Sequence, residues 1–581
     1  MRRTNKNAKL GLKDLNKTVS LLGWVQNIRN LGSITFIDLR DISGIIQLLV
    51  DNEVIDTKSI KFEYLIAVTG LVQEKAVPNP NLVTGMIEIK VSKLNVISTS
   101  QVLPFNLNES TSASEDTKLK YRYLDLRRKE SLRPLLIRHQ ISRIFREFFD
   151  HHGFIEVETP ILTLSTPEGA RDYLVPSRGQ PGSFYALPQS PQLFKQILMV
   201  AGLERYYQFA RCFRDEDLRS DRQPDFTQID LEMSFMSQQE ILKLMEKVLK
   251  KVFQQIVNYE VKLPLRQLTY HDAIDTYGSD KPDTRYEMKL QDLTKIGHQT
   301  SFEPFLKHKF IKGIIINNYA TTLSRKKLDE LVSMAKSMKL ENLYALKVVN
   351  QKLEGGIMKY FDDITATSLI IDLNLKEQDV LLIAVSNVNH LLCSVLGNLR
   401  SFFAKELNLI PPHTYDLLWV VDFPMFEAVN GTSEITPSHH PFTRPKAGHE
   451  KYLAKKPLKA LSSAFDIVIN GYEAGGGSLR IYEESLQAQI FDLLKLSKAE
   501  QENRFGWFLE ALKYGTPPHG GMAFGLDRLT MILANTNNIR DVIAFPKNVS
   551  AVCPLTNAPK PVAAKQLEEL SLVLKEKNEK N

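Results

Sequence analysis

Two short arginine-containing segments, far apart in the chain, constrain what this sequence can fold into more than any other feature. The first is FRDE at Phe213–Glu216, and the second is GLDR at Gly525–Arg528, which follows a glycine-rich segment with the pattern of a strand. Guanidinium groups form forked, charge-assisted hydrogen bonds with phosphate oxygens. Two such groups that converge in the fold would therefore suit the binding of a bent triphosphate.

The length and composition indicate a large multidomain protein. A chain of 581 residues and 66.2 kDa is too long for one hydrophobic core and predicts about three to five domains. Hydrophobic residues make up 43% and charged residues 24%, which is the ordinary balance of a soluble globular enzyme. The net charge of +7 is compatible with a polyanionic partner but does not require one.

No segment indicates secretion or membrane insertion. Residues 1–13 are basic but lack the apolar stretch of a signal peptide. No uninterrupted apolar run approaches the roughly 18 residues that a membrane helix needs. Cys212, Cys393 and Cys553 form no CxxC pair, so isolated thiols in a reducing compartment are favoured over disulfides or zinc. We therefore expect a soluble, cytoplasmic protein without a membrane partner.

Residues 18–95 have the pattern of five short strands separated by turn-rich stretches such as Pro78–Asn81. The expected strands are Val19–Val25, Ile34–Leu39, Ile45–Val50, Tyr64–Val72 and Met86–Lys93. Five strands in this length fit a small closed barrel, and an oligonucleotide-binding barrel is the obvious candidate. On the pattern alone, another small β-domain fits equally well.

A polar hinge then leads to a helix and a strand. Ser110–Lys120 is rich in Ser and Thr and has no apolar periodicity, so a hinge is predicted there. Apolar residues recur at helical spacing from Ile137 to Phe148, and Gly153 predicts the end of that helix. Phe154–Thr159 alternates like a strand and stops at the following proline.

A third motif lies between the first two and completes a family resemblance. It is NGYEAGGGSLR at Asn470–Arg480. Together with FRDE and GLDR it resembles motifs 2 and 3 of the class II aminoacyl-tRNA synthetases, in the form found in bacterial-type aspartyl-tRNA synthetases. The predicted helix, strand and proline resemble motif 1, which forms the dimer interface in that family. The resemblance covers nearly the whole chain and implies a homodimer.

The resemblance also implies a multidomain α/β fold. Its expected segments are an N-terminal oligonucleotide-binding β-barrel over 1–105, a hinge over 106–130, an antiparallel-sheet catalytic domain of the class II synthetases in two parts over 131–287 and 406–553, an α+β insertion domain over 288–405, and a C-terminal extension over 554–581. Mixed patterns such as Lys326–Lys339 and Ala345–Val349 accompany the insertion. The Lys/Glu-rich tail, Pro554–Asn581, is predicted to be helical.

The chemistry of the family begins with attack of an amino-acid carboxylate on the α-phosphate of ATP, so cations are needed where negative charge accumulates. By resemblance, Arg214 bridges the α-phosphate and the aspartate carboxylate, while Arg528 lies against adenine and reaches the γ-phosphate. These two are the predicted catalytic residues. The other predicted ATP contacts are Glu216, Gln223, Phe226 (stacked on the base), Glu473, Gly525, Leu526 and Asp527. An isolated RDE would more often be a charged surface turn.

Asp466 and Glu473 are the predicted Mg²⁺ ligands, because Mg²⁺ prefers hard oxygen ligands and bridges phosphates. They flank a strand-like run at Ile467–Ile469 and lie close to the glycines at 475–477, which allow a ligand to approach the backbone. On its own, the glycine run would also fit a flexible loop.

A substrate side-chain carboxylate in a dry pocket requires a cationic clamp. Arg480 and Lys195 match the residues that hold the β-carboxylate in the family. The other residues expected, by resemblance, to bind aspartate are Glu168 on a mobile loop, Gln192, Arg214, Asp230 at the ammonium group, and His439. An adjacent histidine pair would also fit metal binding or core packing, but no spaced third ligand occurs.

The same resemblance assigns recognition of the tRNA anticodon to the barrel, through aromatic stacking and polar contacts with base edges. Phe36 is the expected stacking platform, Gln47 and Glu88 are the expected base-edge contacts, and Arg29 is a phosphate or base contact. Each alone would more often be ordinary surface or core. The family often has several basic residues where this chain has QNIRN around Arg29, and Leu31 resembles the aspartate-only enzymes.

The predicted function is that of an aspartate–tRNA ligase. ATP, L-aspartate and the aspartate tRNA would react through an aspartyl-adenylate to give aspartyl-tRNA, AMP and pyrophosphate, with Mg²⁺ as cofactor. The alternatives are an enzyme that also charges the asparagine tRNA, an asparaginyl enzyme, a tRNA-independent ligase, and a non-catalytic RNA-binding paralogue. The last two are disfavoured because the chain retains both arginines, both metal carboxylates and the barrel.

Overall fold

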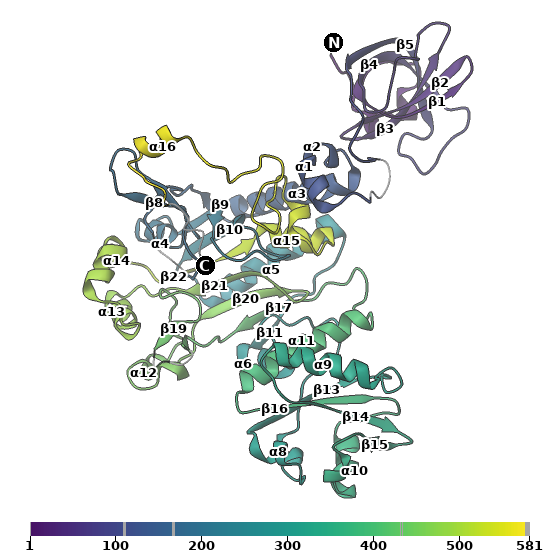
Figure 1. Cartoon of the computed structure of the whole chain (residues 1–581). Helices are drawn as coiled ribbons and strands as arrows, with labels where there is room; N and C mark the ends of the chain where they lie inside the picture. The colour runs from purple at the N-terminus through teal and green to yellow at the C-terminus, as the bar shows by residue number, and fades with distance from the viewer. Residues whose placement is uncertain (1, 108–111, 166–168, 430–431, 433, 576–581) are drawn as a thin grey trace. The chain divides into compact units, whose positions relative to one another are not determined.

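The chain folds into two compact units, shown in the computed structural model of Figure 1. The structure describes residues 2–107, 112–165, 169–429, 432 and 434–575. Unit 1 spans Met1–Arg128 and unit 2 spans Lys129–Asn581. The finer division of unit 2 into catalytic, insertion and C-terminal segments stays a prediction. Within the described ranges, no helix is both long and apolar enough to cross a bilayer.

Unit 1 contains a closed five-stranded barrel with the strand order β1-β2-β3-β5-β4. Its strands are β1 (Thr18–Leu31), β2 (Ile34–Asp41), β3 (Gly44–Asp51), β4 (Leu65–Glu74) and β5 (Ile87–Ser98). Each of the five expected strands is present, and the ladders continue into polar residues beyond the predicted ends. Side chains alternate between the two faces, so Ile46, Leu48 and Val50 fill the interior while Gln47 lies on the outer face.

Short helices precede and follow the barrel. They are η1 (Asn7–Lys9), η2 (Leu12–Asp14), α1 (Glu115–Lys120) and α2 (Arg122–Asp125). The segment that was predicted to be a hinge therefore contains two short helices, and its role as a hinge stays a prediction. Ser114 provides the physical reason for the first helix, because its hydroxyl accepts a hydrogen bond from the Thr117 N–H at 3.3 Å and caps α1.

Unit 2 is built on an eight-stranded sheet. In spatial order its strands are β11 (Arg266–Thr269), β17 (Leu417–Val421), β20 (Ala464–Ile469), β21 (Tyr472–Leu479), β22 (His519–Gly525), β10 (Asp225–Ser234), β9 (Arg205–Phe213) and β6 (Ile155–Glu156). All neighbouring pairs are antiparallel except the two at the edges, β11 with β17 and β6 with β9. The central strands carry the motifs, and the glycine run lies inside β21 instead of in a loop.

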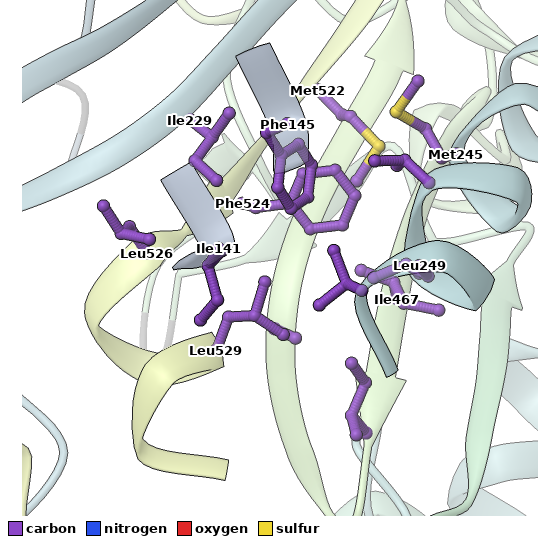
Figure 2. Close-up of a cluster of buried hydrophobic side chains, with 14 of the residues drawn as sticks. Ile141, Phe145, Ile229, Met245, Leu249, Ile467, Met522, Phe524, Leu526 and Leu529 are labelled. Carbon is purple, nitrogen blue, oxygen red and sulfur yellow. The ribbon is translucent and has the colours of Figure 1, made fainter. Parts of the chain in front are cut away.

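Three helices cover one face of this sheet. They are α3 (Lys129–His151), α5 (Gln238–Val257) and α15 (Leu526–Ala534). Figure 2 shows the core that they form with β10, β20 and β22, where Ile141, Phe145, Met245, Leu249, Leu526 and Leu529 meet Ile229, Ile467, Met522 and Phe524. The predicted apolar spacing from Ile137 to Phe148 therefore marks the buried stripe of α3.

Alternate residues of β10 face opposite sides of the sheet, so that one set lies in the core and the other on the opposite face. Ile229, Leu231 and Met233 are buried against the three helices. Asp230 and Glu232 alternate with them and point to the opposite face of the sheet, away from that core. The chain therefore delivers two carboxylates to one buried face at the centre of the sheet.

The predicted insertion contains its own five-stranded sheet with helices on it. The strands, in spatial order, are β12 (Gln291–Asp292), β13 (Phe310–Ile316), β16 (Val380–Ser386), β14 (Leu343–Val349) and β15 (Lys352–Glu354). Its helices are α7 (Thr294–Gly297), α8 (Glu303–Lys307), α9 (Arg325–Ser337), η3 (Met358–Tyr360), α10 (Asp363–Asp372) and α11 (Asn389–Glu406). The helical and strand patterns that were expected in this region correspond to α9 and β14.

Two predicted elements are shorter than expected. Of the strand predicted at Phe154–Thr159, only β6 is present. It lies at the edge of the sheet, where its single neighbour is β9, and the two strands pair over two residues only. The tail forms only α16 (Ala564–Glu569) among its described residues. None of the residues of α16 is buried, and three nearby prolines lack a backbone N–H, so little supports a longer helix.

The remaining elements of unit 2 are short strands and helices outside the two sheets and the three covering helices. They are β7 (Leu174–Pro176), β8 (Phe184–Ala186), α4 (Gln192–Val200), α6 (Tyr270–Tyr277), β18 (Phe426–Ala428), β19 (Ile435–Pro437), α12 (Glu450–Leu453), η4 (Pro457–Lys459), α13 (Glu484–Leu493), α14 (Lys498–Leu512) and η5 (Ile539–Val542).

Candidate active site

A cavity of about 360 Å³ lies on the central strands of the large sheet, and most of the predicted site residues line it. Those that do are Gln192, Lys195, Arg214, Glu216, Gln223, Phe226, Asp230, His439, Asp466, Glu473, Arg480, Gly525, Asp527 and Arg528. They come from α4, β10, β20, β21, β22, the start of α15 and the loops that adjoin these elements. The sheet therefore gathers residues from distant parts of the sequence into one site.

A buried network of four charges lies at the cavity, and three of its members, Lys195, Asp230 and Arg480, line it. Lys195 and Arg480 are each 2% exposed. Lys195 Nζ lies 2.7 Å from Asp230 Oδ1 and 3.2 Å from Glu232 Oε2. Arg480 donates two hydrogen bonds to Glu232, from Nε at 2.9 Å and from Nη2 at 3.1 Å. The charges of two cations and two carboxylates thus cancel in a part of the protein that is shielded from water.

The two carboxylates in this network differ in their electrostatic surroundings. Burial raises the pKa of Asp230, although Lys195 opposes the rise. Burial also disfavours the charge of Glu232, but Arg480 and Lys195 together hold its pKa below the ordinary value. Among the described residues, Asp230 Oδ2 and Gln192 Nε2 are buried without a hydrogen-bond partner. One acceptor and one donor are therefore free to bind a polar ligand.

The two adjacent histidines have different neighbours. His440 Nε2 lies 2.7 Å from Nη1 of Arg480, and burial and then the Arg480 charge hold the His440 pKa well below its ordinary value. His439 lies edge-on to Phe423, and its Nε2 is 3.9 Å from Asp466 Oδ1. Both rings line the cavity, but His440 and not the predicted His439 contacts the clamp arginine.

The two motif arginines, Arg214 and Arg528, also line the cavity. The Arg214 guanidinium carbon is 5.1 Å from the centre of the Phe226 ring, so the two groups stack. Arg528 lies 3.2 Å from Asp221 and donates to the backbone carbonyl of Glu473. Its Nε is buried without a partner among the described residues. Both guanidinium groups thus face a shared cavity that could hold a phosphate chain.

The two predicted metal ligands, Asp466 and Glu473, both line the cavity. Burial, then the charges of Glu473 and Asp280, raise the Asp466 pKa well above its ordinary value. Gly476 leaves room for Asp466, since a Cβ at this glycine would lie 2.4 Å from Asp466 Oδ1. Within the described ranges, no group of three or more His, Cys, Asp or Glu could enclose a metal. Two carboxylates suit an ion such as Mg²⁺ that completes its shell with phosphate and water.

Comparisons with known proteins identify the family. Residues 114–549 match the model of the tRNA synthetases class II (D, K and N), and residues 19–97 match the OB-fold nucleic acid binding domain. The chain is 48% identical, over the full length of both chains, to proteins named aspartate–tRNA(Asp/Asn) ligase in Bacillus cereus strain ATCC 10987 / NRS 248 and Bacillus mycoides strain KBAB4.

The chain belongs to the bacterial aspartyl-tRNA synthetases. The resemblance drawn from the motifs is therefore confirmed, as is the predicted fold. A crystal structure of asparaginyl-tRNA synthetase from Pyrococcus horikoshii with asparaginyl-adenylate has the same fold. It aligns with a TM-score of 0.59 at 19% identity, covering 94% of this chain and 98% of that one.

A few residues expected to contact substrates in this synthetase make other contacts. Leu526 was expected to contact ATP, but its side chain lies in the core because it is on the inward face of α15. The Asp527 carboxylate accepts from the Thr227 N–H at 2.8 Å and pairs with Arg138. Glu168 lies outside the described residues.

Gln223 is also engaged by the protein. Its side-chain amide exchanges hydrogen bonds with the Lys547 backbone at 3.0 and 2.9 Å. The amide therefore fixes the position of the segment around Lys547 at the rim of the cavity, and its contact with ATP stays a prediction.

Two residues of the synthetase site, Glu232 and His440, were not predicted from the sequence. Glu232 is fully buried between Lys195 and Arg480. A signal was present, because Glu232 follows Asp230 by the strand period of two and faces Gly521, where a Cβ would lie 2.2 Å from Glu232 Oε2. No signal in the sequence separates His440 from its neighbour.

The four predicted anticodon residues lie together on the outer face of the synthetase barrel. Gln47 donates to Glu88 at 2.9 Å, and Arg29 donates to Gln47 at 3.3 Å. Gln47 and Glu88 are 9% and 3% exposed, whereas Phe36 is partly exposed on the neighbouring strand. The polar pair is thus held in place, and the aromatic ring is accessible.

Proposed function

We propose that the protein is an aspartate–tRNA ligase that activates L-aspartate with ATP and transfers it to the 3′ end of tRNA. The observation that carries this proposal is the pairing of Lys195 and Arg480 with Glu232, next to an Asp230 oxygen without a partner. A pocket of this kind offers two rigid cations to a carboxylate and one acceptor to an ammonium group. L-Aspartate carries both of these groups, a β-carboxylate for the cations and an ammonium group for the acceptor.

Each of these cavity residues has a separate role in the formation of the adenylate. Arg480 and Lys195 hold the β-carboxylate, Asp230 Oδ2 accepts from the ammonium group, and the α-carboxylate points toward Arg214. Arg214 neutralises charge that develops on the α-phosphate as the carboxylate oxygen attacks and pyrophosphate leaves. Arg528 holds the distal phosphates. A 3′-terminal ribose hydroxyl of tRNA then attacks the adenylate, so no covalent enzyme nucleophile is required.

Asp466 and Glu473 would hold Mg²⁺ in this reaction. The surroundings of Asp466 support the assignment, because a nearby cation would favour the charged form that burial and the charge of Glu473 disfavour. When bound, Mg²⁺ supplies charge neutralisation for the phosphates. Asp466 depends on Gly476 for its position, and Glu473 is also 3.8 Å from Lys281.

Rejection of asparagine follows from the charge balance of the pocket. An amide in place of the β-carboxylate would place an NH₂ donor against Lys195 or Arg480, both of which only donate. The lost charge-assisted bonds amount to several kcal/mol, on the order of 10³-fold in rate. The test is ATP–pyrophosphate exchange with the purified enzyme. Exchange with L-aspartate and little with L-asparagine is expected, and exchange with neither would refute the proposal.

A second function is favoured by the names of the relatives, which are aspartate–tRNA(Asp/Asn) ligases. We propose that this enzyme also charges the asparagine tRNA with aspartate. Leu31, which resembles the aspartate-only enzymes, argues against this, but it is a single residue, 70% exposed at the end of β1.

Charging with radiolabelled aspartate of two pure transcripts, one for each tRNA, decides the matter. Charging of both transcripts is expected. Charging of the aspartate tRNA alone would favour the Leu31 prediction. Charging of neither, with active control enzymes, would favour the non-catalytic paralogue.

We further propose a homodimer through the motif 1 region. Four apolar side chains that begin at β6 are about half exposed, which is unusual for a cluster of this kind on a monomer. They are Ile155 at 51%, Ile161 at 48%, Leu162 at 52% and Leu164 at 47%. Light scattering should give twice the chain mass, and Leu162→Asp should give monomers. A wild-type monomer at micromolar concentration would contradict the proposal.

We also propose that the enzyme works in the cytoplasm. Cys212, Cys393 and Cys553 are all buried thiols, a state that suits a reducing compartment.

A further inference from the structure

The N-terminal arm, residues 2–17, carries the whole positive excess of the barrel region. The arm has six Lys or Arg against one Asp, a net charge of +5. The barrel proper, residues 18–100, has seven Lys or Arg against eight Asp or Glu, a net charge of −1. Binding to nucleic acid depends on neutralising phosphates with Lys and Arg. The barrel proper therefore lacks a net attraction for RNA, and the arm supplies one.

The arm is built into the barrel. Asn7 is fully buried, and its backbone N–H donates to Asp41 Oδ2 at 3.0 Å while its side-chain amide donates to the Leu39 carbonyl at 2.9 Å. Leu10 is 3% exposed and belongs to the barrel core. A charged segment that served only solubility would not require a buried asparagine anchor. The fold thus holds the arm in one place.

Most cations of the arm are available to a partner. Arg3 pairs with Asp41 at 3.5 Å, and Lys17 pairs with Asp14 at 2.9 Å. The other four are exposed and, among the residues that the structure describes, make no ion pair; they are Arg2, Lys6, Lys9 and Lys13.

The arm lies next to the predicted RNA-binding strands. The Ala8 N–H donates to Ser43 Oγ at 3.0 Å, which places η1 against the start of β3. The loop between β4 and β5 rests at the same place, because Thr84 Oγ1 donates to the Ile45 carbonyl at 2.6 Å. Gln47, a predicted anticodon contact, follows two residues later on β3. The arm and this loop therefore flank one end of the strand that carries Gln47.

We propose that residues 2–17 form a binding surface for the phosphate backbone of tRNA beside the anticodon. This inference rests on the proposed function, since it assumes that tRNA is the substrate. Lysine and arginine contacts with phosphates position a nucleic acid without reading its bases. The arm therefore contributes affinity equally to the aspartate and asparagine tRNAs, and anticodon selectivity is left to contacts with the bases.

The test is a quadruple variant, Arg2→Ala/Lys6→Ala/Lys9→Ala/Lys13→Ala, in the full-length enzyme. Binding of a tRNA transcript is measured between about 50 and 300 mM salt, a range in which phosphate contacts make the affinity strongly salt-dependent. Each lost contact should weaken binding about four- to fivefold near 150 mM salt and reduce the salt slope by roughly 0.7–0.9. ATP–pyrophosphate exchange should stay unchanged, which separates this test from a failure of the proposed function.

A matched control removes four exposed lysines from the insertion, through Lys295→Ala, Lys309→Ala, Lys336→Ala and Lys339→Ala. The control loses the same total charge and should keep its salt slope. Equal losses in both variants would overturn the proposal, because net charge would then explain the effect. An unchanged dependence of tRNA affinity on salt in the arm variant would also overturn the proposal. So would a variant that loses binding to phosphatidylserine vesicles while its affinity for tRNA stays the same.

Discussion

Replacement of Arg480 by methionine tests whether the buried clamp binds substrate or only holds the fold. The wild-type pocket contains two cations and two carboxylates, and Arg480→Met leaves Lys195 alone with Asp230 and Glu232. Because Glu232 loses a bidentate partner while fully buried, unfolding should become easier by about 3–5 kcal/mol. The double variant Arg480→Met/Glu232→Gln restores neutrality and should recover much of this stability.

The two variants should nevertheless share one functional defect. Without the guanidinium, the β-carboxylate of aspartate loses its forked partner, a loss of about 4 kcal/mol. This corresponds to about a 10³-fold drop in kcat/KM for aspartate in ATP–pyrophosphate exchange. Chemical unfolding measures the stability of both variants. If the double variant regained aspartate activation along with stability, Arg480 would act only as the partner of Glu232, and the clamp assignment would be refuted.

Three further outcomes follow from the same site. Asp466→Asn removes a buried carboxyl whose charged form is disfavoured by burial and by the charge of Glu473, so the metal-free protein should become more stable to chemical unfolding. In the same variant, pyrophosphate exchange and the stabilisation by Mg²⁺ in calorimetry should disappear. The pKa of Glu232 is lowered in the folded protein, so its charge stabilises the fold above pH 4.5, the ordinary pKa of a glutamate. This stability is lost as the pH falls through the folded-state pKa. Glu232→Gln should therefore flatten the acid side of a stability–pH profile, and an unchanged profile would contradict this. Gly476→Ala should displace Asp466 and lower exchange about 100-fold, whereas Gly179→Ala, with open space around it, should leave the rate unchanged.

Prediction from the sequence succeeded where a residue type carries its own signal. Alternating apolar residues located the barrel strands, and the spacing from Ile137 to Phe148 located the buried face of α3. Shorter elements were less predictable, because the sheet edge decides how much of a strand is paired. The segment at Phe154–Thr159 shows this, since its pattern resembles a strand although only β6 has a partner.

The candidate site was predictable as a set of residues and unpredictable as a set of contacts. Arg480 and Lys195 were assigned to the substrate carboxylate, but Glu232, which holds both of them, was not identified. Arg480 and Glu232 are 248 residues apart in the chain. They meet because β10, β22 and β21 are neighbours in the sheet, and no local pattern encodes that order.

The sequence by itself determined the family, the chemical groups and the alternation that sends each side chain to one face of a strand. Those properties are local, because they depend on residue type and on the geometry of a few consecutive residues. Only the tertiary structure decided which charges neutralise each other, that His440 and not His439 contacts Arg480, and that Leu526 lies in the core. These outcomes depend on burial, which raises the free energy of every unpaired charge and therefore selects partners from anywhere in the chain.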